Sequence, residues 1–485
     1  MNFRITSSTF TNRAIHFTAI HGANVSKYQN QIASGVKFQR PSEEPIAFRQ
    51  VTALRTRFAE LQADRKSINQ ATSVLNTSVV QIQEFSDLVT TAKSLALQGV
   101  QTFDSDQRNA LALEVEGLLE RLKSVSVATF NGRYLYGGTQ SSQPPFEFSD
   151  PANDGGSIVV DYVGSSRRSR AIVGDSIAVD TYYDGSEVFG SAGRRETVIL
   201  GSTGAQIGPG TDTLSGRTNL LVTNDTTTFL GASGVQSGTG AADGDTVIGQ
   251  VGQHSLEIID TAGDGSAGTI RLNGGTEIAF TNTDTNLRLE GPEGEVVYVD
   301  TTAITAGFSG TVDIDATGSL SVDGGATSIA IDFSVSQSVV HSTFGTAVSI
   351  DSTGISKAGT DFLEFSGTSN AFQVLDELAS DLRNERNLST PELSNALTRR
   401  IADLEGLATN AFDTLAEQSS SLATLDSLGF RADDLMNSIQ INVSELQATD
   451  IPEAALRFNN SQSLLEYTYA VTAQLSSLSL LNFLR

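Results

Sequence analysis

Histidine and cysteine are the residues that most often build a catalytic or metal site, and this chain offers few of them. It contains no cysteine, and no two of its histidines lie at the spacing of a helical zinc motif with its glutamate. His16 and His21 lie five residues apart in a polar segment that is compatible with a helix, where a solvated or interfacial role is the better interpretation. We therefore expect no metal site. The four histidines are His16, His21, His254 and His341.

Two glycine-containing segments imitate ligand-binding loops. Gly263, Gly265 and Gly268 have the spacing of a dinucleotide-binding loop, but the residues that follow favour a strand rather than the required helix. Asp313 begins a partial calcium-loop pattern whose twelfth position is Gly324, which supplies no carboxylate. We expect a hairpin loop in the first case, a β-turn in the second, and no bound cofactor.

The remaining charged residues suggest no reaction. Arg167, Arg168 and Arg170 form one compact basic cluster, which could meet an acidic neighbour but is better interpreted as a solvated strand edge. The acidic residues of the middle region could form a carboxylate pair after folding, although their spacing does not indicate one. We therefore predict that the chain is not an enzyme.

Composition excludes further classes. With 485 residues and 39% hydrophobic residues, the chain is long enough for two or three domains with real cores. The net charge of −25 argues against binding to nucleic acid or to an anionic membrane surface. Residues 467–484 carry no charge, but polar residues interrupt them, and we expect no membrane insertion. The N-terminus shows no cleaved secretory signal.

The N-terminal flank shows the seven-residue repeat of a coiled coil. Apolar residues recur from Leu54 to Ala96 at this interval, which predicts one long helix of about 75 Å over residues 50–99. Asp104 and Gln107 have the spacing of a capping box and predict a second helix that folds back on the first. The predicted seam includes Leu54, Leu61, Ile68, Leu75 and Ile82.

The C-terminal flank repeats the same pattern. Thr390 and Pro391 suit the cap and first position of a helix, and a last helix begins near Asp450 with Glu453 as its capping partner. Because neither flank can bury its stripe alone, we expect the N-terminal and C-terminal helices to pair. Seam positions here include Leu404, Leu425 and Ile439.

Glycine separates the middle of the chain from the flanks, since 34 of the 44 glycines lie within residues 141–365. Short alternating runs such as 157–163 and 294–300 predict antiparallel strands joined by tight turns. Residues 297–305 resemble 348–356, which is either a weak sign of duplicated β units or a chance similarity of β-prone segments. The fold class is therefore α+β multidomain: an antiparallel coiled-coil rod from both chain ends, with a large all-β insertion between them.

We divide the chain accordingly. Terminal helices occupy residues 1–44 and 450–485, the rod occupies 45–140 and 366–449, and the β-rich outer region occupies 141–365, with two subdomains possible at 141–190 and 191–365. A chain of this design favours polymerisation, and we expect the terminal stripes to fold on assembly and to form its interface. The interface residues are Val25, Tyr28, Ile32, Leu464, Val471, Leu475, Leu478 and Leu481.

Both flanks resemble the flagellin superfamily of self-assembling bacterial flagellar proteins, over residues 1 to about 140 and about 366 to 485. Residues 40–47, Arg-Pro-Ser-Glu-Glu-Pro-Ile-Ala, resemble the family's break between helices, and residues 131–140, Asn-Gly-Arg-Tyr-Leu-Tyr-Gly-Gly-Thr-Gln, resemble its exit from the rod. The prolines favour the hook-associated branch over filament flagellins. The matching motif residues are Pro41, Ser42, Pro45, Asn131, Gly132, Gly137 and Gly138.

The resemblance implies a structural subunit that self-assembles into a junction ring between the hook and the filament. Its implied partners are copies of itself, neighbouring hook-associated and flagellin subunits, and an export chaperone on the C-terminal helices. The implied location is extracellular, in the flagellum, after type III export without a cleaved signal peptide. One alternative is a filament flagellin. Another, of a different class, is a flagellum-displayed adhesin or glycan-acting module in residues 190–365.

Overall fold

A computed structural model describes residues 7–149, 157–174, 177–238 and 247–483. The chain divides into two compact units. Unit 1 contains residues 1–73, 171–179 and 422–485, and unit 2 contains residues 74–170 and 180–421. The unit boundaries between residues 73 and 74 and between residues 421 and 422 each fall inside a long helix.

The helices follow the sequence signals closely. Asp104 caps α3 by accepting from the backbone N–H of Asp106, and Asp450 accepts from the N–H of Glu453 at the start of α7. The start of α6 differs by one residue from our prediction, because Ser389 rather than Thr390 pairs with Glu392 as the cap. The helices are α1 (Ser7–Ser34), α2 (Pro45–Gln101), α3 (Ser105–Ser126), α4 (Gly185–Val188), α5 (Ala371–Arg383), α6 (Thr390–Gln447) and α7 (Ile451–Phe483).

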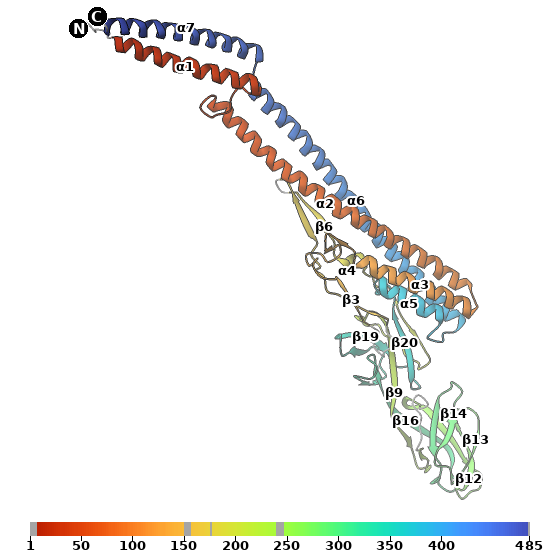
Figure 1. Ribbon diagram of the computed structural model, residues 1–485. Helices are drawn as coiled ribbons and strands as arrows, with labels where there is room; N and C mark the ends of the chain where they lie inside the picture. Colours follow the sequence, from red (N-terminus) through yellow and green to blue (C-terminus); the bar gives the residue numbers. More distant parts are fainter. Residues whose placement is uncertain (1–6, 150–156, 175–176, 239–246, 484–485) are drawn as a thin grey trace. The chain divides into compact units, whose positions relative to one another are not determined.

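Helices α2 and α6 run antiparallel within each unit, as Figure 1 shows. In unit 1, Arg65 pairs with Asp433 at 3.1 Å. In unit 2, the Gln418 side chain donates to Ser78 at 2.8 Å, and Lys93 pairs with Glu405 at 2.7 Å. Residue numbers therefore rise along one helix as they fall along the other.

The predicted seam positions face the interior. Leu61 and Ile439 share an apolar cluster with Leu54 at its margin, all in unit 1. The others named for the seam are also buried, which accounts for the seven-residue spacing, while the coiled-coil geometry itself stays a prediction. These buried positions are Ile68, Leu75, Ile82, Leu404 and Leu425.

The β strands lie in unit 2, except β5 and β6, which cross its boundary with unit 1. They include strands within the two runs 157–163 and 294–300 predicted from alternation. The strands are β1 (Thr129–Phe130), β2 (Arg133–Tyr134), β3 (Phe146–Ser149), β4 (Val159–Tyr162), β5 (Ser169–Val173), β6 (Ile177–Tyr182), β7 (Thr197–Leu200), β8 (Gln206–Ile207), β9 (Gly216–Leu230), β10 (Gln236–Ser237), β11 (Gly249–Asp260), β12 (Ala267–Leu272), β13 (Ile278–Thr281), β14 (Leu287–Glu290), β15 (Val296–Asp300), β16 (Ser309–Ser321), β17 (Ile329–Ala330), β18 (Gln337–His341), β19 (Thr346–Asp351) and β20 (Gly359–Phe365).

Strands β7 to β20 form two modules with the same topology. One eight-stranded sheet runs through both modules, because the long strands β9 and β16 belong to both. The inner module contains β7, β20, the first half of β9, the second half of β16, and β17 from this sheet, and a three-stranded sheet of β18, β19 and β8. The outer module contains the second half of β9, the first half of β16, β11, β12 and β13 from this sheet, and a three-stranded sheet of β14, β15 and β10. Each module has its own apolar core. The outer module is inserted between the third and fourth strands of the inner one.

Register confirms that the two modules are copies. Asn224 pairs with Gly318 across β9 and β16 in the inner module, and Asp260 pairs with Gly268 at the equivalent register across β11 and β12 in the outer module. A Cβ at Gly318 would lie 2.5 Å from the carbonyl oxygen of Thr223, and one at Gly268 would lie 2.1 Å from that of Ile259. The same steric constraint therefore recurs at equivalent positions.

The sequence similarity between 297–305 and 348–356 belongs to this duplication. Both segments begin in an equivalent strand, β15 or β19, and end in a turn where an aspartate accepts from the N–H two residues later, Asp300 from Thr302 and Asp351 from Thr353. Residues 201–208 and 231–238, Gly-Ser-Thr-Gly-Ala-Gln-Ile-Gly and Gly-Ala-Ser-Gly-Val-Gln-Ser-Gly, are a second matching pair. The weak sequence sign was correct, and the duplication is nested rather than tandem.

Two loop predictions have different outcomes. Gly263 and Gly265 lie in the turn between β11 and β12, as expected, where the Asp260 carboxylate accepts from both of their N–H groups. Asp313 and Asp315 lie inside β16, so the predicted β-turn there is wrong. Alternation across a strand, with Val312 and Ile314 buried, explains the spacing of these aspartates.

Candidate assembly surfaces

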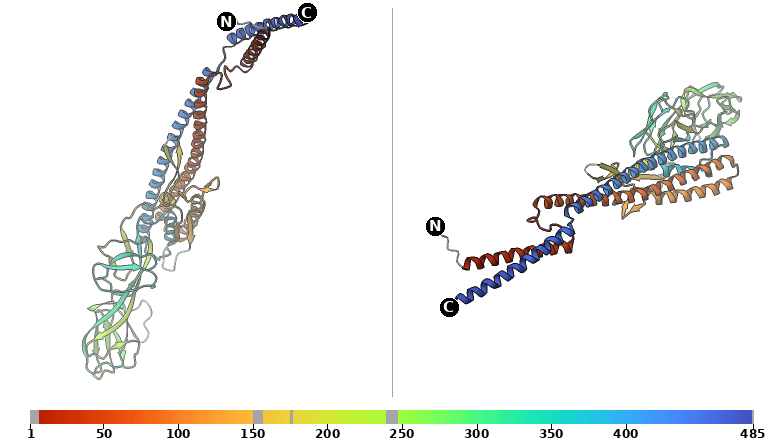
Figure 2. Two further views of the ribbon diagram at one scale, coloured as in Figure 1. Left: turned by 90° about the vertical axis from the view of Figure 1, so that its left-hand side faces the viewer. Right: turned by 90° about the horizontal axis from the view of Figure 1, so that it is seen from above.

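The terminal helices α1 and α7 pair side by side within unit 1. Helix α1 begins and α7 ends at the same end of this pair, as Figures 1 and 2 show. Small residues, Ala14 on α1 and Ala454 and Ser461 on α7, are buried. The close approach of the two helices thus depends on small side chains and leaves larger apolar residues outside.

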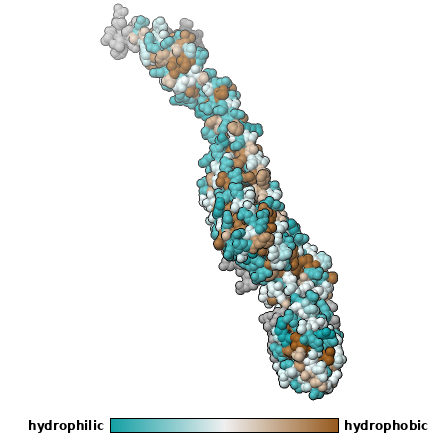
Figure 3. All heavy atoms as spheres, turned by 90° about the vertical axis from the view of Figure 1, so that its right-hand side faces the viewer, coloured by the Kyte–Doolittle hydropathy of each residue, from teal (hydrophilic) through white to brown (hydrophobic). Residues whose placement is uncertain are grey.

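Among the described residues of this pair, several large apolar side chains are exposed. Tyr467 is 70% exposed and Leu456 is 63% exposed, although both are large enough to gain from burial. Figure 3 shows apolar residues, in brown, gathered among polar ones on the face that it draws. The other large apolar residues described as exposed on α1 and α7 are Ile15, Phe17, Ile20, Ile451, Leu464, Tyr469 and Val471.

The predicted interface residues fall into three groups. Val25, Tyr28 and Ile32 on α1 are half-buried, and Tyr28 contacts the guanidinium of Arg457 on α7. Leu464 and Val471 on α7 are exposed. The side chains of Leu475, Leu478 and Leu481 lie outside the described residues. Their role in an interface stays a prediction.

Two backbone hydrogen bonds join the connection between α1 and α2 to the connection between α6 and α7. The N–H of Lys37 donates to the carbonyl of Gln447 at 2.7 Å, and the N–H of Thr449 donates to the carbonyl of Gly35 at 3.0 Å. Gly35 has φ +67° and ends α1. Both helical breaks thus lie at one level of unit 1.

The motif residues Pro41, Ser42 and Pro45 lie in this connection. Pro45 is the first residue of α2, where a proline loses no helical hydrogen bond. The carboxylate of Glu43 accepts from the N–H groups of Gln39 and Arg40, and the first of these bonds is the main cause that lowers the pKa of Glu43. The turn is thus held by its own acidic residue.

The second motif needs glycine for geometric reasons. Asn131 and Gly132 form the two-residue turn between β1 and β2, with φ of +51° and +74°, which an Asn-Gly turn adopts readily. Gly138 has φ +57°, and a Cβ there would lie 2.2 Å from the carbonyl oxygen of Ser165. A Cβ at Gly137 would lie 2.7 Å from the carbonyl oxygen of Gln140. Larger side chains do not fit this crossing.

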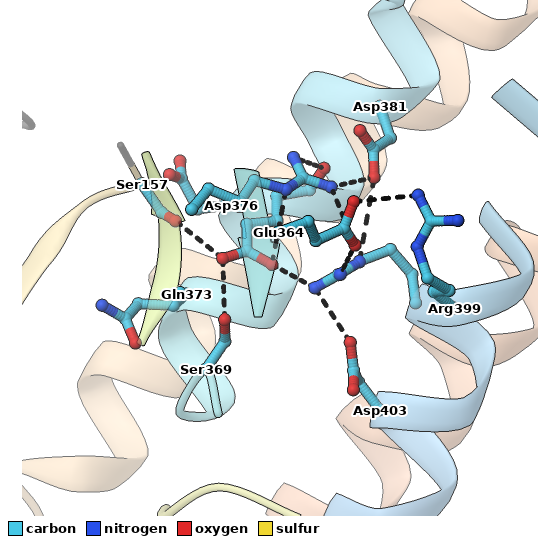
Figure 4. A network of polar contacts seen from close by, with 12 residues as sticks. Ser157, Glu364, Ser369, Gln373, Asp376, Asp381, Arg399 and Asp403 are labelled. Atoms are coloured by element: carbon cyan, nitrogen blue, oxygen red, sulfur yellow. Dashed lines mark hydrogen bonds and ion pairs between the residues drawn. The ribbon is translucent and has the colours of Figure 1, made fainter. Parts of the chain in front are cut away.

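A buried network of ion pairs attaches the inner module to the helices of unit 2. Arg400 of α6 is 1% exposed and contacts Glu364 of β20, Glu377 of α5 and Asp403. Arg217 of β9 contacts Asp381 of α5. Figure 4 shows the labelled carboxylates of the network, Glu364 of β20, Asp381 of α5 and Asp403 of α6, around its arginines.

The network is also hydrogen-bonded at its edges. Arg399 donates to Glu364 at 2.9 Å, and Arg386 donates to Asp381 at 2.6 Å. The Glu377 carboxylate accepts from Ser157 at 2.7 Å and from Ser369 at 2.8 Å. Figure 4 shows both serines pointing toward this carboxylate. Buried charges that are paired and hydrogen-bonded in this way are specific but costly to separate.

Burial and the neighbouring arginines together set the pKa values of the carboxyl groups in this network. Burial raises the pKa of Glu364, but the guanidiniums of Arg400 and Arg217 and the contact with Arg399 outweigh it, so this pKa lies well below its ordinary value. For Asp403, burial dominates over the attraction of Arg400, and its pKa is raised. Glu364 is therefore a carboxylate at neutral pH.

Sequence reasoning missed this network. Its members are far apart in the chain, and only tertiary packing brings them together. One signal was available: Arg400 lies three residues after Leu397 and four before Leu404, on the buried side of α6. A charge on such a stripe indicates a buried partner.

The basic cluster is also more structured than we predicted. Arg168 pairs with Glu187 at 2.9 Å and with Glu417 of α6, and its guanidinium lies 4.9 Å from the centre of the Tyr183 ring. Only about a fifth of its side chain is exposed, at 22%. The interpretation as a solvated strand edge is therefore wrong for Arg168, which links the strands to α6.

Within the described ranges, no three histidine, aspartate or glutamate side chains gather in a way that could hold a metal ion. None of the described helices is both long and apolar enough to cross a membrane.

Comparisons with known proteins agree with the helices and motifs of the N-terminal flank. Residues 8–141 match the bacterial flagellin N-terminal helical region. Flagellar hook-associated protein 3 of Escherichia coli (strain K12) is 28% identical over 159 residues, which cover 31% of this chain and 49% of that protein. The chain carries a flagellin N-terminal helical region and is similar to flagellar hook-associated protein 3 over 31% of its length. The protein of the same name from Salmonella typhimurium is 26% identical over 152 residues, 30% of this chain and 47% of that protein.

The match to these two relatives is partial, since the chain spans about half of their length. Among solved structures, the flagellar junction protein FlgL from Legionella pneumophila is 14% identical, with a TM-score of 0.42, over 82% of this chain and 99% of that one. FlgL from Xanthomonas campestris is 15% identical, with a TM-score of 0.38, over 80% and 97%.

Proposed function

We propose that this FlgL-like chain is a structural subunit of the bacterial flagellum that joins the hook to the filament by self-assembly into a junction ring. The relatives named flagellar hook-associated protein 3 support a flagellar role, and the motif around Pro41 and Pro45 supports the hook-associated branch. The chain acts through contacts between subunits rather than through a reaction.

The exposed apolar surface of α1 and α7 carries this proposal. Tyr467 and Leu456 alone leave most of their surface in water, and each large apolar side chain contributes roughly 1.5–3 kcal/mol when it is fully buried. Six such residues would supply roughly 9–18 kcal/mol before the entropic cost of association. A surface of this kind favours a polymer in which neighbouring copies cover it.

The other parts have supporting roles in the proposal. The terminal helices, residues 1–44 and 450–485, would line an inner tube, and the rod of residues 45–140 and 366–449 would pack as a coiled coil beside neighbouring subunits. The outer region, residues 141–365, would face outward, held by the network around Arg400. Neighbouring hook-associated and flagellin subunits would contact the ring on its two sides.

Export belongs to the same proposal. A chain whose terminal stripe remains unburied before assembly needs protection, and we propose that an export chaperone covers α7 until the chain reaches the flagellum tip. The chain would then act outside the cell, without removal of a signal peptide.

Electron microscopy of a deletion strain, with immunogold labelling of the chain on wild-type flagella, tests the proposal. Hooks without filaments, flagellin lost to the medium, and label confined to the junction are the expected results. Label along the whole filament would replace the junction role with that of a flagellin. Intact filaments in the deletion strain would direct attention to residues 190–365 as a surface adhesin or glycan-acting module.

A further inference from the structure

The two β modules are copies, so a surface that differs between them marks a role that one has and the other lacks. Strand β18 of the inner module is equivalent to β14 of the outer one, because both pair at the edge of a three-stranded sheet with β19 and β15 respectively. Gly345 and Gly294 hold the same positive-φ position in the hairpin turn that follows, with φ of +63° and +77°. These anchors align the two edges residue by residue.

The inner edge exposes large apolar residues where the outer edge exposes polar and charged ones. Val335 is 59% exposed, Val340 is 51% exposed and Phe344 is 62% exposed. The Phe344 ring lies 4.6 Å from the ring of His341, measured between centroids, which holds it in place. The equivalent outer residues are Thr285, Glu290 and Glu293.

Charge differs in the same way. Residues 333–350 contain no aspartate, glutamate, lysine or arginine, although residues 141–365 as a whole contain 29 acidic and nine basic residues. The equivalent outer segment, residues 284–299, contains five charged residues. Natural edge strands usually carry charges that prevent association with other strands, and Arg288 and Glu290 provide such charges on β14. The inner edge lacks this protection.

We propose that Val335, Ser338, Val340 and Phe344, here called the β18 patch, form a docking surface for a second copy of this chain. A neighbouring copy has the same net charge of −25, so it can approach closely only where like charges are absent. The β18 patch is such a place on the inner module. A cationic partner would instead bind where acidic residues attract it, and this segment has none.

The inference rests on the proposed function in one respect, which is that copies of the chain must lie next to one another. It assigns the contact between adjacent copies to the inner module. The outer module, whose equivalent edge carries glutamates, stays free of such contact. The inner and outer edges therefore provide a test and its matched control within one chain.

Site-directed photo-cross-linking in intact cells tests the inference, because the chain contains no cysteine and one introduced thiol is unique. Ser338→Cys, labelled with a thiol-reactive benzophenone, should yield a product with the mass of two chains. Arg288→Cys, at the equivalent position of β14, should not. Cross-linking of Ser338→Cys to a different protein, or no cross-linked product from Ser338→Cys, would overturn the inference. This result does not depend on where in the flagellum the chain is located.

A triple variant provides the second measurement. Val335→Thr, Val340→Glu and Phe344→Glu together give the inner edge the residues that the outer module already tolerates, so the fold should be kept. The two-chain product from Ser338→Cys should fall at least about tenfold, which corresponds to about 1.4 kcal/mol of association free energy. An unchanged yield, with circular dichroism showing a folded chain, would show that these side chains do not make the contact. Immunogold labelling separately reports whether the chain is at the junction.

Discussion

Arg400→Met should separate the helices of unit 2 from the inner β module, because it removes the cation at the centre of the buried network. Methionine fills a similar volume but carries no charge. Glu364 and Glu377 then lose their closest guanidinium, and Asp403 loses its partner at 2.9 Å. These carboxylates are about 1% exposed, so water cannot replace the lost contacts.

The expected loss follows from burial. Removing one partner of a buried ion pair costs about 3–5 kcal/mol, since it leaves an uncompensated charge. The surface pair of Lys93 and Glu405 joins α2 to α6 in the same unit, with side chains that are 37% and 57% exposed. Lys93→Met should cost at most about 1 kcal/mol, because water screens that pair. It is the matched control.

Urea unfolding followed by far-ultraviolet circular dichroism and by limited proteolysis compares the variants. Arg400→Met should shift the transition of unit 2 much further than Lys93→Met and should open cleavage between β20 and α5. The double variant Arg400→Met, Glu377→Gln should cost less than the sum of the two single changes, because the unpaired charge is then removed. Equal shifts for Arg400→Met and Lys93→Met would refute the role of the network as the attachment point.

Three further predictions concern pH, assembly and backbone geometry. The folded pKa of Glu364 lies below its ordinary value of 4.5, so its contribution to stability is complete above that pH and is lost as the pH falls through the folded pKa. The difference in unfolding free energy between wild type and Glu364→Gln should therefore narrow below pH 4.5. A constant difference in urea unfolding curves measured at decreasing pH would contradict the assignment. Leu464→Asp should leave monomer stability nearly unchanged but prevent incorporation into flagella. The control Gln462→Asp, on another side of α7, should incorporate normally. Equal labelling of flagella by both variants would show that Leu464 is not in the interface. Gly138→Ala should lower the free energy of unfolding by about 1–3 kcal/mol, measured in thermal melts. Gly117→Ala in α3, where a Cβ meets nothing within 4 Å, should raise the free energy of unfolding slightly. An unchanged stability of Gly138→Ala would show that the backbone near Ser165 can move to make room.

Local features of this chain could be predicted from its sequence because their causes are local. Asp104 caps α3 and Pro45 starts α2 through contacts within one turn, so residue type and spacing were sufficient. The seven-residue apolar spacing likewise predicted which residues of α2 and α6 are buried, including Leu75 and Leu404. The motif glycines were recognisable because positive φ and close backbone approach exclude other residues.

The sequence by itself thus determined the long helices of the two flanks, their buried sides and the resemblance to flagellins, all of which depend on short-range patterns, whereas α4 and α5 were not predicted. Only the tertiary structure decided the nested duplication, because most equivalent strands of the two modules have diverged while their register has not. It also decided the ion network, since pairing Arg217 with Asp381 or Arg400 with Glu364 depends on folding that joins distant segments. Whether an apolar residue such as Val340 or Tyr467 is covered or left for a partner is likewise a property of packing, which residue type alone does not fix.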